Sequence, residues 1–552
     1  MKPCKRFNPA DVRLAGALFP LVLGAVAALP AAVFAADVPV PSGAISSELL
    51  RQPQRLERAE PQGGDTGPAL DVPMVGDQKL PDNPNVSFTL ESVTFSETAI
   101  LSREELDAVV KPYVGRKAGF AELQQIIGSL NALYNDKGYV TARAILPPQR
   151  IENGRVEIRL VEGRVGELVF EGNTYMSPRF LRERIDVQSG ELVDPRRLEA
   201  ELSRFNRISS GALSASLQPG KGYGLTDVYV KVAEPPRNSL DLFANNHGYE
   251  STGEESGGLM YRHYGALGTD DVFSLFASGS QGSGVGSLSY DAPVNPYGTR
   301  LGARVGKSRA RVIYGPFRDL DSVSDSKNAS IFASQPLWSN RDWLLTGTLT
   351  YGENRTENRV SGVFLNESRV RSTQGEVTAL YLAPGRSARI NAGYQRARSE
   401  IQGTPQQEIF DLWAGYWQLY QSLSERWFLN SAGGWQYSPK EGVPSSQLFQ
   451  IGGATTVRGY RQGEIAGDGG IYGNLQANYN VNPAVTVFGF YDYGKIDSSF
   501  RQPEKIDSVG TGFNWRMGSR VSTEASLGVP LTNVRSDQDD VYLNVQLVFK
   551  VL

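Results

Sequence analysis

A glycine-rich stretch late in the chain holds a lone arginine where the backbone can turn tightly. It reads Gln450-Ile-Gly-Gly-Ala-Thr-Thr-Val-Arg-Gly-Tyr-Arg461, with Val457, Arg458, Gly459 and Tyr460 at its centre. Glycine tolerates the backbone angles of tight turns, so the spacing predicts that Arg458 stands at the tip of a turn. By itself such an arginine is more often a solvated surface residue, so its role depends on the elements around it.

A carboxylate lies in an alternating segment that follows this loop. Thr486, Phe488, Phe490 and Asp492 share one face of a predicted strand, and the other face is apolar. The stretch from Gly489 to Lys495 also has the spacing of a phosphate-binding loop. However, Ile496 stands where Ser or Thr would bind Mg²⁺, and no helix follows. We therefore interpret the segment as a strand and not as a nucleotide site.

The composition excludes several other kinds of chemistry. Two histidines, His247 and His263, and the single Cys4 cannot supply a zinc site of several His or Cys ligands or a Cys/His catalytic pair. The 56 basic and 59 acidic residues form no basic stripe, which argues against a nucleic-acid partner. We expect no enzyme activity and no cofactor.

The first 35 residues have the layout of a secretory signal peptide. Basic residues from Lys2 to Arg13 precede an apolar run from Leu14 to Phe34, and small residues favour cleavage after Ala35. The alternative, a retained membrane anchor, is disfavoured by Pro20 and Pro30 within the run. After residue 36 no apolar stretch of about 18 residues occurs, so we expect no helical membrane span.

Residues 36–85 divide into a helix and a linker. Ile45, Leu49 and Leu50 lie amid polar residues, and the pattern predicts a short amphipathic helix over 42–58 within the region 36–60. Residues 61–85 hold five prolines and a Gly-Gly pair without periodicity, which is typical of a linker.

The next 150 residues contain an internal repeat. Val156, Ile158, Leu160 and Glu162 recur as Val228, Val230, Val232 and Glu234, displaced by 72 residues. Helix-start signals precede both sets, at Ser102 with Glu105 and at Asp194 with Pro195. Residues 86–163 and 164–235 are therefore predicted as two α+β domains of order β-α-α-β-β, whose edge strands can accept an extended guest.

From residue 236 to 552 the pattern changes to segments of about ten residues with alternating apolar and polar side chains. This is the signal of transmembrane β-barrel strands. We count eleven before Ser445 and five after Gly470, near 238–247, 257–265, 271–279, 284–291, 299–307, 327–336, 342–351, 371–383, 386–397, 408–420, 426–437, 471–480, 484–494, 507–516, 519–528 and 541–550. An even total of about sixteen antiparallel strands predicts a closed barrel with Asp492 facing inward. The soluble alternative, a secreted propeller, lacks a blade-length repeat.

This order of elements resembles the TpsB transporters of two-partner secretion, the FhaC/ShlB/HecB family. Two β-α-α-β-β units, similar to POTRA domains, precede the barrel, and the Val457–Tyr460 motif falls between its eleventh and twelfth strands. The first unit also matches the family pattern at Gly138–Arg143, Leu146–Gln149 and Val161–Gly163. The Val-Arg-Gly-Tyr motif alone marks a wider superfamily that includes the Bam insertase. The combination with two POTRA-like units and an N-terminal helix selects the transporter branch.

The resemblance implies a location and a mechanism. The POTRA domains lie in the periplasm, the barrel crosses the outer membrane after insertion by the barrel-assembly machinery, and loop 445–470 folds into the lumen so that Arg458 contacts Asp492. A large exoprotein with an N-proximal secretion domain is captured, with Tyr139, Val140, Thr141, Ala142 and Arg143 as a candidate contact strand. The helix at 42–58 leaves the lumen, and the exoprotein is exported and can thereby be activated.

Three alternatives remain open at this level. An insertase of the Bam/Tam type would have more than two POTRA domains, and a passive solute porin would need neither residues 86–234 nor a loop carrying Arg458. The third, a soluble secreted adhesin or lectin, would show no heat-modifiable mobility and would need no detergent for extraction. The cargo of a transporter could be an adhesin, a haemolysin or a contact-dependent toxin.

Overall fold

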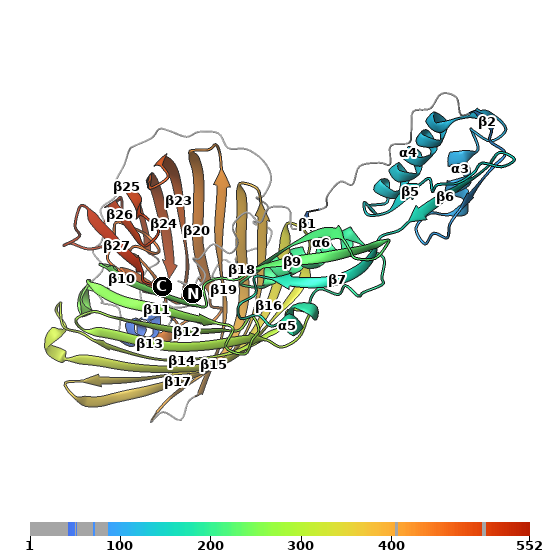
Figure 1. Cartoon of the computed structure of the whole chain (residues 1–552). Helices are drawn as coiled ribbons and strands as arrows, with labels where there is room; N and C mark the ends of the chain where they lie inside the picture. The colour runs from blue at the N-terminus through green and yellow to red at the C-terminus, as the bar shows by residue number, and fades with distance from the viewer. Residues whose placement is uncertain (1–41, 50, 52–69, 72–86, 403–406, 499–503) are drawn as a thin grey trace, which may run out of the picture.

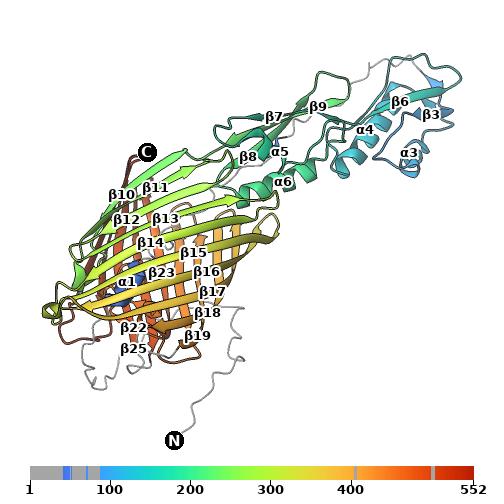
Figure 2. The same ribbon diagram turned by 90° about the horizontal axis from the view of Figure 1, so that it is seen from below.

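The computed structural model describes residues 42–49, 51, 70–71, 87–402, 407–498 and 504–552. A large barrel carries the second β-α-α-β-β unit on one end, and the first unit extends further outward (Figures 1 and 2). The end of the barrel next to the second unit is called the near end below, and the opposite end is the far end. In the described residues, no helix has the length and apolar character needed to cross a membrane.

The barrel is closed by sixteen antiparallel strands, which confirms the predicted number and its division into eleven and five. The last strand pairs with the first from Asp241↔Lys550 to Asn245↔Gln546. The strands are β10 (Asn238–Asn245), β11 (Ser256–Tyr264), β12 (Val272–Gly279), β13 (Ser283–Pro293), β14 (Arg300–Arg311), β15 (Ser322–Ser339), β16 (Trp343–Val360), β17 (Val363–Ala383), β18 (Arg386–Ile401), β19 (Gln407–Ser422), β20 (Trp427–Tyr437), β23 (Gly469–Asn482), β24 (Val485–Asp497), β25 (Glu504–Met517), β26 (Val521–Pro530) and β27 (Tyr542–Lys550).

Several strands are longer than the alternation predicts, and the additional residues lie at the far end. β16 continues from the expected limit at 351 to Val360, and β17 begins at Val363 and not at 371. In these extensions polar side chains occur on both faces, and Val363, Phe364 and Leu365 follow one another at the start of β17, so the apolar–polar alternation stops although the hydrogen-bond ladder continues.

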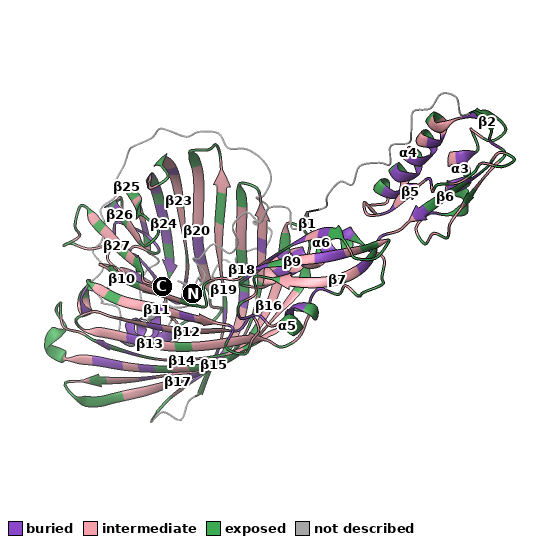
Figure 3. Ribbon diagram, viewed as in Figure 1, coloured by how far each residue is buried: buried purple, intermediate pink, exposed green. Residues whose placement is uncertain are grey.

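The first unit contains two helices over a small sheet, as predicted. α3 (Arg103–Val110) has the complete capping box of Ser102 and Glu105, and α4 (Phe120–Asp136) has the predicted bounds. The sheet has the order β3-β6-β5, formed by β3 (Ser92–Phe95), β6 (Arg155–Val161) and β5 (Arg143–Ile145), beside a short pair of β2 (Phe88–Thr89) and β4 (Lys117–Ala118). The buried face of α4 packs on this sheet and forms the core (Figure 3).

Two strand predictions in this unit are wrong in extent. The predicted strand 86–96 is interrupted between β2 and β3, where Glu91 N–H donates to the carbonyl of Gly154 at 2.8 Å. The predicted strand Tyr139–Leu146 is reduced to β5, because Gly138, at a φ of +89°, begins a turn that includes residues 140 and 141. Alternation in the sequence cannot detect such local turns.

The second unit repeats the plan with β7 (Arg164–Glu171), α5 (Pro178–Arg182), α6 (Pro195–Ile208), β8 (Ala212–Pro219) and β9 (Leu225–Ala233). Ser177 and Asp194 cap the two helices as predicted. Glu162 and Glu234, the repeated glutamates, occupy equivalent places. Each accepts backbone N–H bonds from the loop after the first strand of its unit, at Ala99 for Glu162 and at Met176 for Glu234.

Two described pieces precede the first unit. α1 (Ser42–Leu49) lies inside the barrel (Figure 2), and β1 (Leu70–Asp71) adds a parallel strand to the edge of β8. The predicted helix over 42–58 is thus observed for eight residues, and its remainder and the signal-peptide prediction lie outside the described residues. Within the predicted linker 61–85, β1 is an ordered exception that the sequence did not indicate.

Candidate functional site

The connection between β20 and β23, residues 438–468, turns back into the barrel and is called the inward loop. It contains a short hairpin of β21 (Phe449–Ile451) and β22 (Ile465–Gly467), close to the predicted bounds 445–470. Its base is fixed because the Asp468 carboxylate accepts the N–H of Val443 at 2.9 Å. At the tip, Gly452 and Gly453 have φ of +112° and +91°, and the Thr456 hydroxyl closes the turn on the Gly452 carbonyl.

The tip places Arg458 against Asp492 on the inner wall of β24. Arg458 Nε lies 2.8 Å from Oδ2 and Nη2 lies 2.8 Å from Oδ1, a two-pronged contact between the planar groups. The backbone N–H of Arg458 also donates to Oδ2 at 2.9 Å. Asp492 is completely buried and Arg458 is 7% exposed. The two residues singled out from the sequence are therefore brought together at hydrogen-bonding distance.

Aromatic rings cover the pair. The Arg458 guanidinium carbon lies 3.5 Å from the centroid of the Phe490 ring, a cation–π geometry. Room for the rings depends on glycines in β25, because a Cβ on Gly510 would come within 2.3 Å of Phe490, and one on Gly512 within 2.4 Å of Phe488. The wall is therefore shaped around the arginine by small residues on the neighbouring strand.

The other residues of the motif anchor the tip to the same wall. Val457 is fully buried, and Gly459 has a φ of +93°. The hydroxyl of Tyr460 lies 2.9 Å from the carbonyl oxygen of Asp507 and 2.8 Å from that of Thr532. The motif thus fastens one loop to β24, β25 and the connection after β26.

Sequence reasoning missed one direct partner of Arg458. Gln476 on β23 accepts a hydrogen bond from Nη1 at 2.7 Å, which completes the planar set of contacts around the guanidinium. Gln476 pairs with Phe490 across the sheet, so both residues face inward. Gln476 could have been identified by aligning the predicted strand 471–480 with the next strand. The residue opposite the inward-facing Phe490 must also face inward.

The inward loop also holds α1. Gln450 Nε2 donates to the carbonyl of Ala44 at 3.3 Å, and the Tyr249 hydroxyl donates to Gln450 Oε1 at 2.8 Å. Arg51, just after α1, donates to the carbonyl of Ser446 at 2.7 Å. A movement of the loop would therefore break contacts that retain the helix.

Hydroxyl groups hold the opposite side of α1 on the barrel wall. Ser42 contacts Ser324 at 2.8 Å, and Ser46 contacts Ser326 at 2.6 Å. Ile45 packs with Phe276 and its apolar neighbours. All side chains of α1 that the structure describes are buried, the serines against hydroxyl groups of the wall and Ala44 and Ile45 in two apolar clusters, so this helix has no face exposed to solvent.

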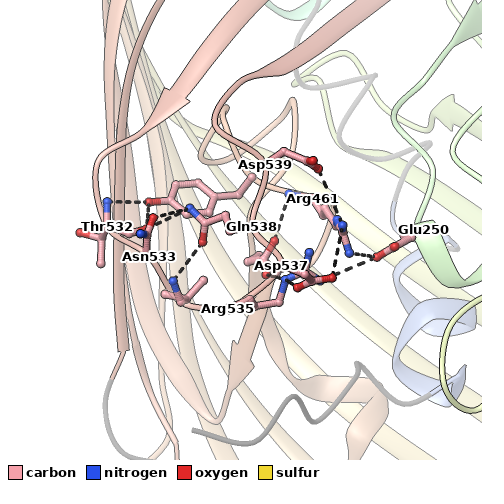
Figure 4. Close-up of polar contacts among 11 residues, drawn as sticks. Glu250, Arg461, Thr532, Asn533, Arg535, Asp537, Gln538 and Asp539 are labelled. Atoms are coloured by element: carbon pink, nitrogen blue, oxygen red, sulfur yellow. Dashed lines mark hydrogen bonds and ion pairs between the residues drawn. The ribbon is translucent and has the colours of Figure 1, made fainter. Parts of the chain in front are cut away.

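An ion cluster joins the inward loop to two other far-end connections (Figure 4). Arg461 of the inward loop pairs with Glu250, which follows β10, and lies 3.7 Å from Asp539 after β26. Arg535 lies 3.1 Å from Glu464 and 3.3 Å from Asp537. The sequence did not indicate this cluster, because its residues lie in three connections that become neighbours only when the barrel closes.

The candidate cargo strand is only partly a strand. Of Tyr139, Val140, Thr141, Ala142 and Arg143, only Arg143 lies in β5. The next residue, Ala144, donates its N–H to Asn131 of α4 at 2.8 Å, so this part of the edge already has a partner.

The described residues include no group of three or more His, Cys, Asp or Glu side chains that could hold a metal ion. The site consists instead of one buried ion pair, a loop tip and a captured helix. These can fix or release chain segments, which is what a gated passage requires.

Comparison with known proteins identifies the family. A family model described as haemolysin secretion/activation protein ShlB/FhaC/HecB matches residues 224–517, more than half of the chain. The chain belongs to this family. A second model, POTRA domain of the ShlB type, matches residues 88–163, which is the first unit.

Similar proteins extend over nearly the full length. The heme/hemopexin transporter protein HuxB of Haemophilus influenzae is 22% identical over 93% of this chain and 94% of its own. The outer membrane transporter CdiB of Dickeya dadantii is 24% identical over 88% of this chain and 89% of its own. The solved structure of CdiB from Escherichia coli has a TM-score of 0.63 at 18% identity, covering 93% of this chain and 99% of that one.

Family membership confirms the predicted function and location. The protein is an outer-membrane transporter of two-partner secretion that moves a partner exoprotein to the cell surface, with its POTRA units in the periplasm. The family consists of transporters, consistent with a role other than catalysis. The near end of the barrel therefore faces the periplasm, and the far end faces the cell exterior.

Proposed function

We propose that the second POTRA unit captures an unfolded segment of the exoprotein by strand addition at β8, and that α1 closes the pore until this happens. The cargo contributes an N-proximal secretion domain, and its folding outside the cell favours export. The transporter itself reaches the membrane through the barrel-assembly machinery.

The pairing of β1 with β8 carries this proposal. Leu70 and Asp71 align with Ala215 and Ser216 in a parallel ladder, so the edge of β8 accepts an extended backbone. Main-chain hydrogen bonds make few demands on sequence, which suits the capture of an unfolded chain. Because β1 occupies this edge, a cargo strand must replace it.

The pairing also connects capture with the pore. Leu70 lies on the sheet of the second unit, and Arg51, nineteen residues earlier, lies in the lumen beside the inward loop. Displacement of β1 removes an attachment of the chain on the C-terminal side of α1, and the single hydroxyl contacts of Ser42 and Ser46 are weak enough for the helix to be released.

A reversible crosslink tests the proposal. Asp71→Cys with Ser216→Cys places two thiols at paired positions of β1 and β8 in a chain whose only natural cysteine is Cys4. We expect the oxidised variant to assemble normally but to secrete little cargo, with secretion restored by reductant. Full secretion with the disulfide intact would contradict capture at this edge. Each single-cysteine variant is the control.

The closing role of α1 has its own measurement. Deletion of residues 42–58 is expected to raise single-channel conductance in planar bilayers, because it removes the helix that crosses the lumen. Unchanged conductance would mean that another segment closes the pore.

A further inference from the structure

The outer face of β14–β18 carries basic side chains at a height where a lipid headgroup would lie. Side chains alternate along each strand, and Ser308, Ser326 and Thr356 face the lumen because they contact α1 or one another. Their neighbours Lys307, Lys327 and Arg355 therefore point outward. The strands that carry them lie side by side (Figure 2).

These three cations and Arg369 form one row across four strands. Lys307 pairs with Lys327, Lys327 with Arg355, and Arg355 with Arg369, each directly opposite the next. Like charges directly opposite on one face of a sheet destabilise it. With strands about 4.8 Å apart, the row is roughly 14 Å long. Anions bound along the row would reduce this repulsion.

The carboxylates of the protein lie beside the arginine end of the row. The Glu353 carboxylate lies 3.2 Å from Arg355, 3.4 Å from Arg369 and 2.9 Å from Arg371, and Glu367 lies 3.7 Å from Arg355. Among the described residues, no carboxylate lies within ion-pair distance of Lys307 or Lys327, and both side chains are exposed. The next row toward the exterior is mixed in sign and consists of Arg309, Asp325, Glu357 and Glu367.

The height of the row follows from the strand geometry. Trp343 and Tyr381, whose ring centroids are 4.9 Å apart, lie at the periplasmic end of the outward face. Arg355 is twelve residues further along β16, roughly 40 Å along the strand. At the usual strand tilt this corresponds to roughly 30 Å along the membrane normal, above an apolar band about 25 Å tall.

Directly below the row the outward face holds Val305, Ala329, Glu353 and Arg371, and apolar side chains predominate further toward the periplasmic end. Val305, Ile331 and Leu349 face outward and are 50%, 63% and 58% exposed. A cationic row above an apolar face suits a molecule with phosphates at one end and acyl chains at the other, which a free anion does not have.

We propose that this surface, defined by Lys307, Lys327, Arg355 and Arg369, binds the phosphates of a glycolipid in the outer leaflet of the membrane. The length of the row suits a headgroup that carries more than one phosphate. The bound lipid would neutralise the aligned cations and hold the long far-end extensions of β15–β18 against the membrane surface.

Lipid binding by the purified full-length protein tests this proposal. The protein is stripped of lipid in neutral detergent and titrated with lipopolysaccharide, with retention measured by native mass spectrometry. We expect the double variant Lys307→Gln, Lys327→Gln to bind about tenfold more weakly, since each removed cation loses one attraction to a phosphate. The matched control, Arg341→Gln with Arg386→Gln, removes two exposed cations at the periplasmic end of the same strands.

Two further binding measurements distinguish the phosphate of a lipid headgroup from a free phosphate ion. The same lipopolysaccharide with its phosphates removed should bind wild type as weakly as it binds the double variant. Inorganic phosphate should not displace the lipid at equal phosphate concentration. Equal binding of the dephosphorylated lipid, full displacement by inorganic phosphate, or equal losses in variant and control would each overturn the proposal.

A stability measurement covers the case in which the double variant assembles poorly. In lipid-free detergent, Lys327→Gln should leave the unfolding temperature unchanged or raise it, because it removes like-charge pairs. Added lipopolysaccharide should then stabilise wild type more than this variant. The same gain in both proteins would also overturn the proposal.

Discussion

The Arg458–Asp492 contact combines short, well-aligned hydrogen bonds with a large free-energy cost of removing both charges from water. Both partners of the pair are buried, and the carboxylate receives three N–H groups from one residue. For such pairs the Coulomb attraction is largely offset by the loss of hydration. The pair therefore defines the position of the loop tip more than it adds to the free energy of unfolding.

Removal of either partner should abolish most secretion. Arg458→Ala or Asp492→Ala leaves a charge in a desolvated site, at a cost of about 3–5 kcal/mol if water stays out and much less if it enters. The double variant should be no worse than the worse single variant, because the two residues act as one unit. Surface-exposed cargo and the heat-modifiable barrel are measured in each variant.

Lys495→Ala, which removes an exposed cation from the same strand, is the control for these variants. Additive losses in the double variant would show that the two residues are not functional partners. Wild-type secretion from Arg458→Ala would exclude the inward loop as the functional site.

The loop tip also depends on a glycine that the sequence did not single out. A Cβ on Gly528 would lie 2.5 Å from the backbone nitrogen of Gly459, so Gly528→Ala forces the tip away from the wall. We expect several-fold lower secretion and greater protease access to the inward loop. Gly489→Ala, whose Cβ would have no atom nearer than 3.8 Å, should behave as wild type. Equal behaviour of the two variants would show that the tip tolerates displacement.

At the scale of elements, the sequence predicts structure where local signals are strong. The capping box at Ser102, the Asp194-Pro195 helix start and the alternation of the barrel all produced the expected elements. The same alternation correctly placed Asp492 on the face of its strand that points into the lumen.

The remainder depends on contacts distant in the chain. β1 exists because Leu70 meets the edge of β8, and Gln476 becomes a ligand of Arg458 only once the barrel closes. The far-end extensions of β16 and β17 do not alternate between apolar and polar side chains, so their hydrogen-bond ladder leaves no pattern in the sequence. The helix, strand and turn propensities of neighbouring residues do not indicate contacts between distant parts of the chain.

Glu234, the second of the two repeated glutamates, is expected to make the stability of the second POTRA unit sensitive to acid. Burial alone would raise the pKa of Glu234, but hydrogen bonds from Thr174, Met176 and Tyr175 lower it below its ordinary value of 4.5. A lowered folded-state pKa contributes stability above pH 4.5, and this contribution is lost as the pH falls through the folded value. Glu234→Gln should therefore cost about 1 kcal/mol at pH 7 and little at low pH.

Far-UV circular dichroism can follow this unfolding in the intact protein, because α3–α6 lie in the POTRA units and the barrel is made of strands. Urea midpoints are compared at pH 7 and pH 3 for wild type, Glu234→Gln and the exposed control Glu183→Gln. A difference between wild type and Glu234→Gln that does not depend on pH would contradict the titration argument.

At the scale of the whole molecule, the second POTRA unit is fastened to the periplasmic turns of the barrel. Asp270, 2% exposed in the turn between β11 and β12, accepts the backbone N–H of Ser210 at 3.2 Å and Arg300 Nη1 at 2.9 Å. Arg184 of the second unit donates to the carbonyl of Asn295 at 2.9 Å. These contacts orient the edge of β8 relative to the pore.

Asp270→Ala should loosen this orientation without unfolding either part. Ser210 loses its acceptor, and Arg300 keeps Asp291 at 2.6 Å, so the barrel retains its own ion pair and the contact to the POTRA unit is lost. Spin labels at Glu191→Cys and Arg341→Cys should report a broader distance distribution, together with reduced secretion and an unchanged heat-modifiable barrel. Glu425→Ala, which removes an exposed carboxylate from another periplasmic turn, should leave the distance distribution narrow.

If Asp270→Ala also leaves the distance distribution narrow, the remaining contacts are sufficient for docking. If it broadens while secretion stays normal, a fixed orientation of β8 is not needed for cargo to reach the pore.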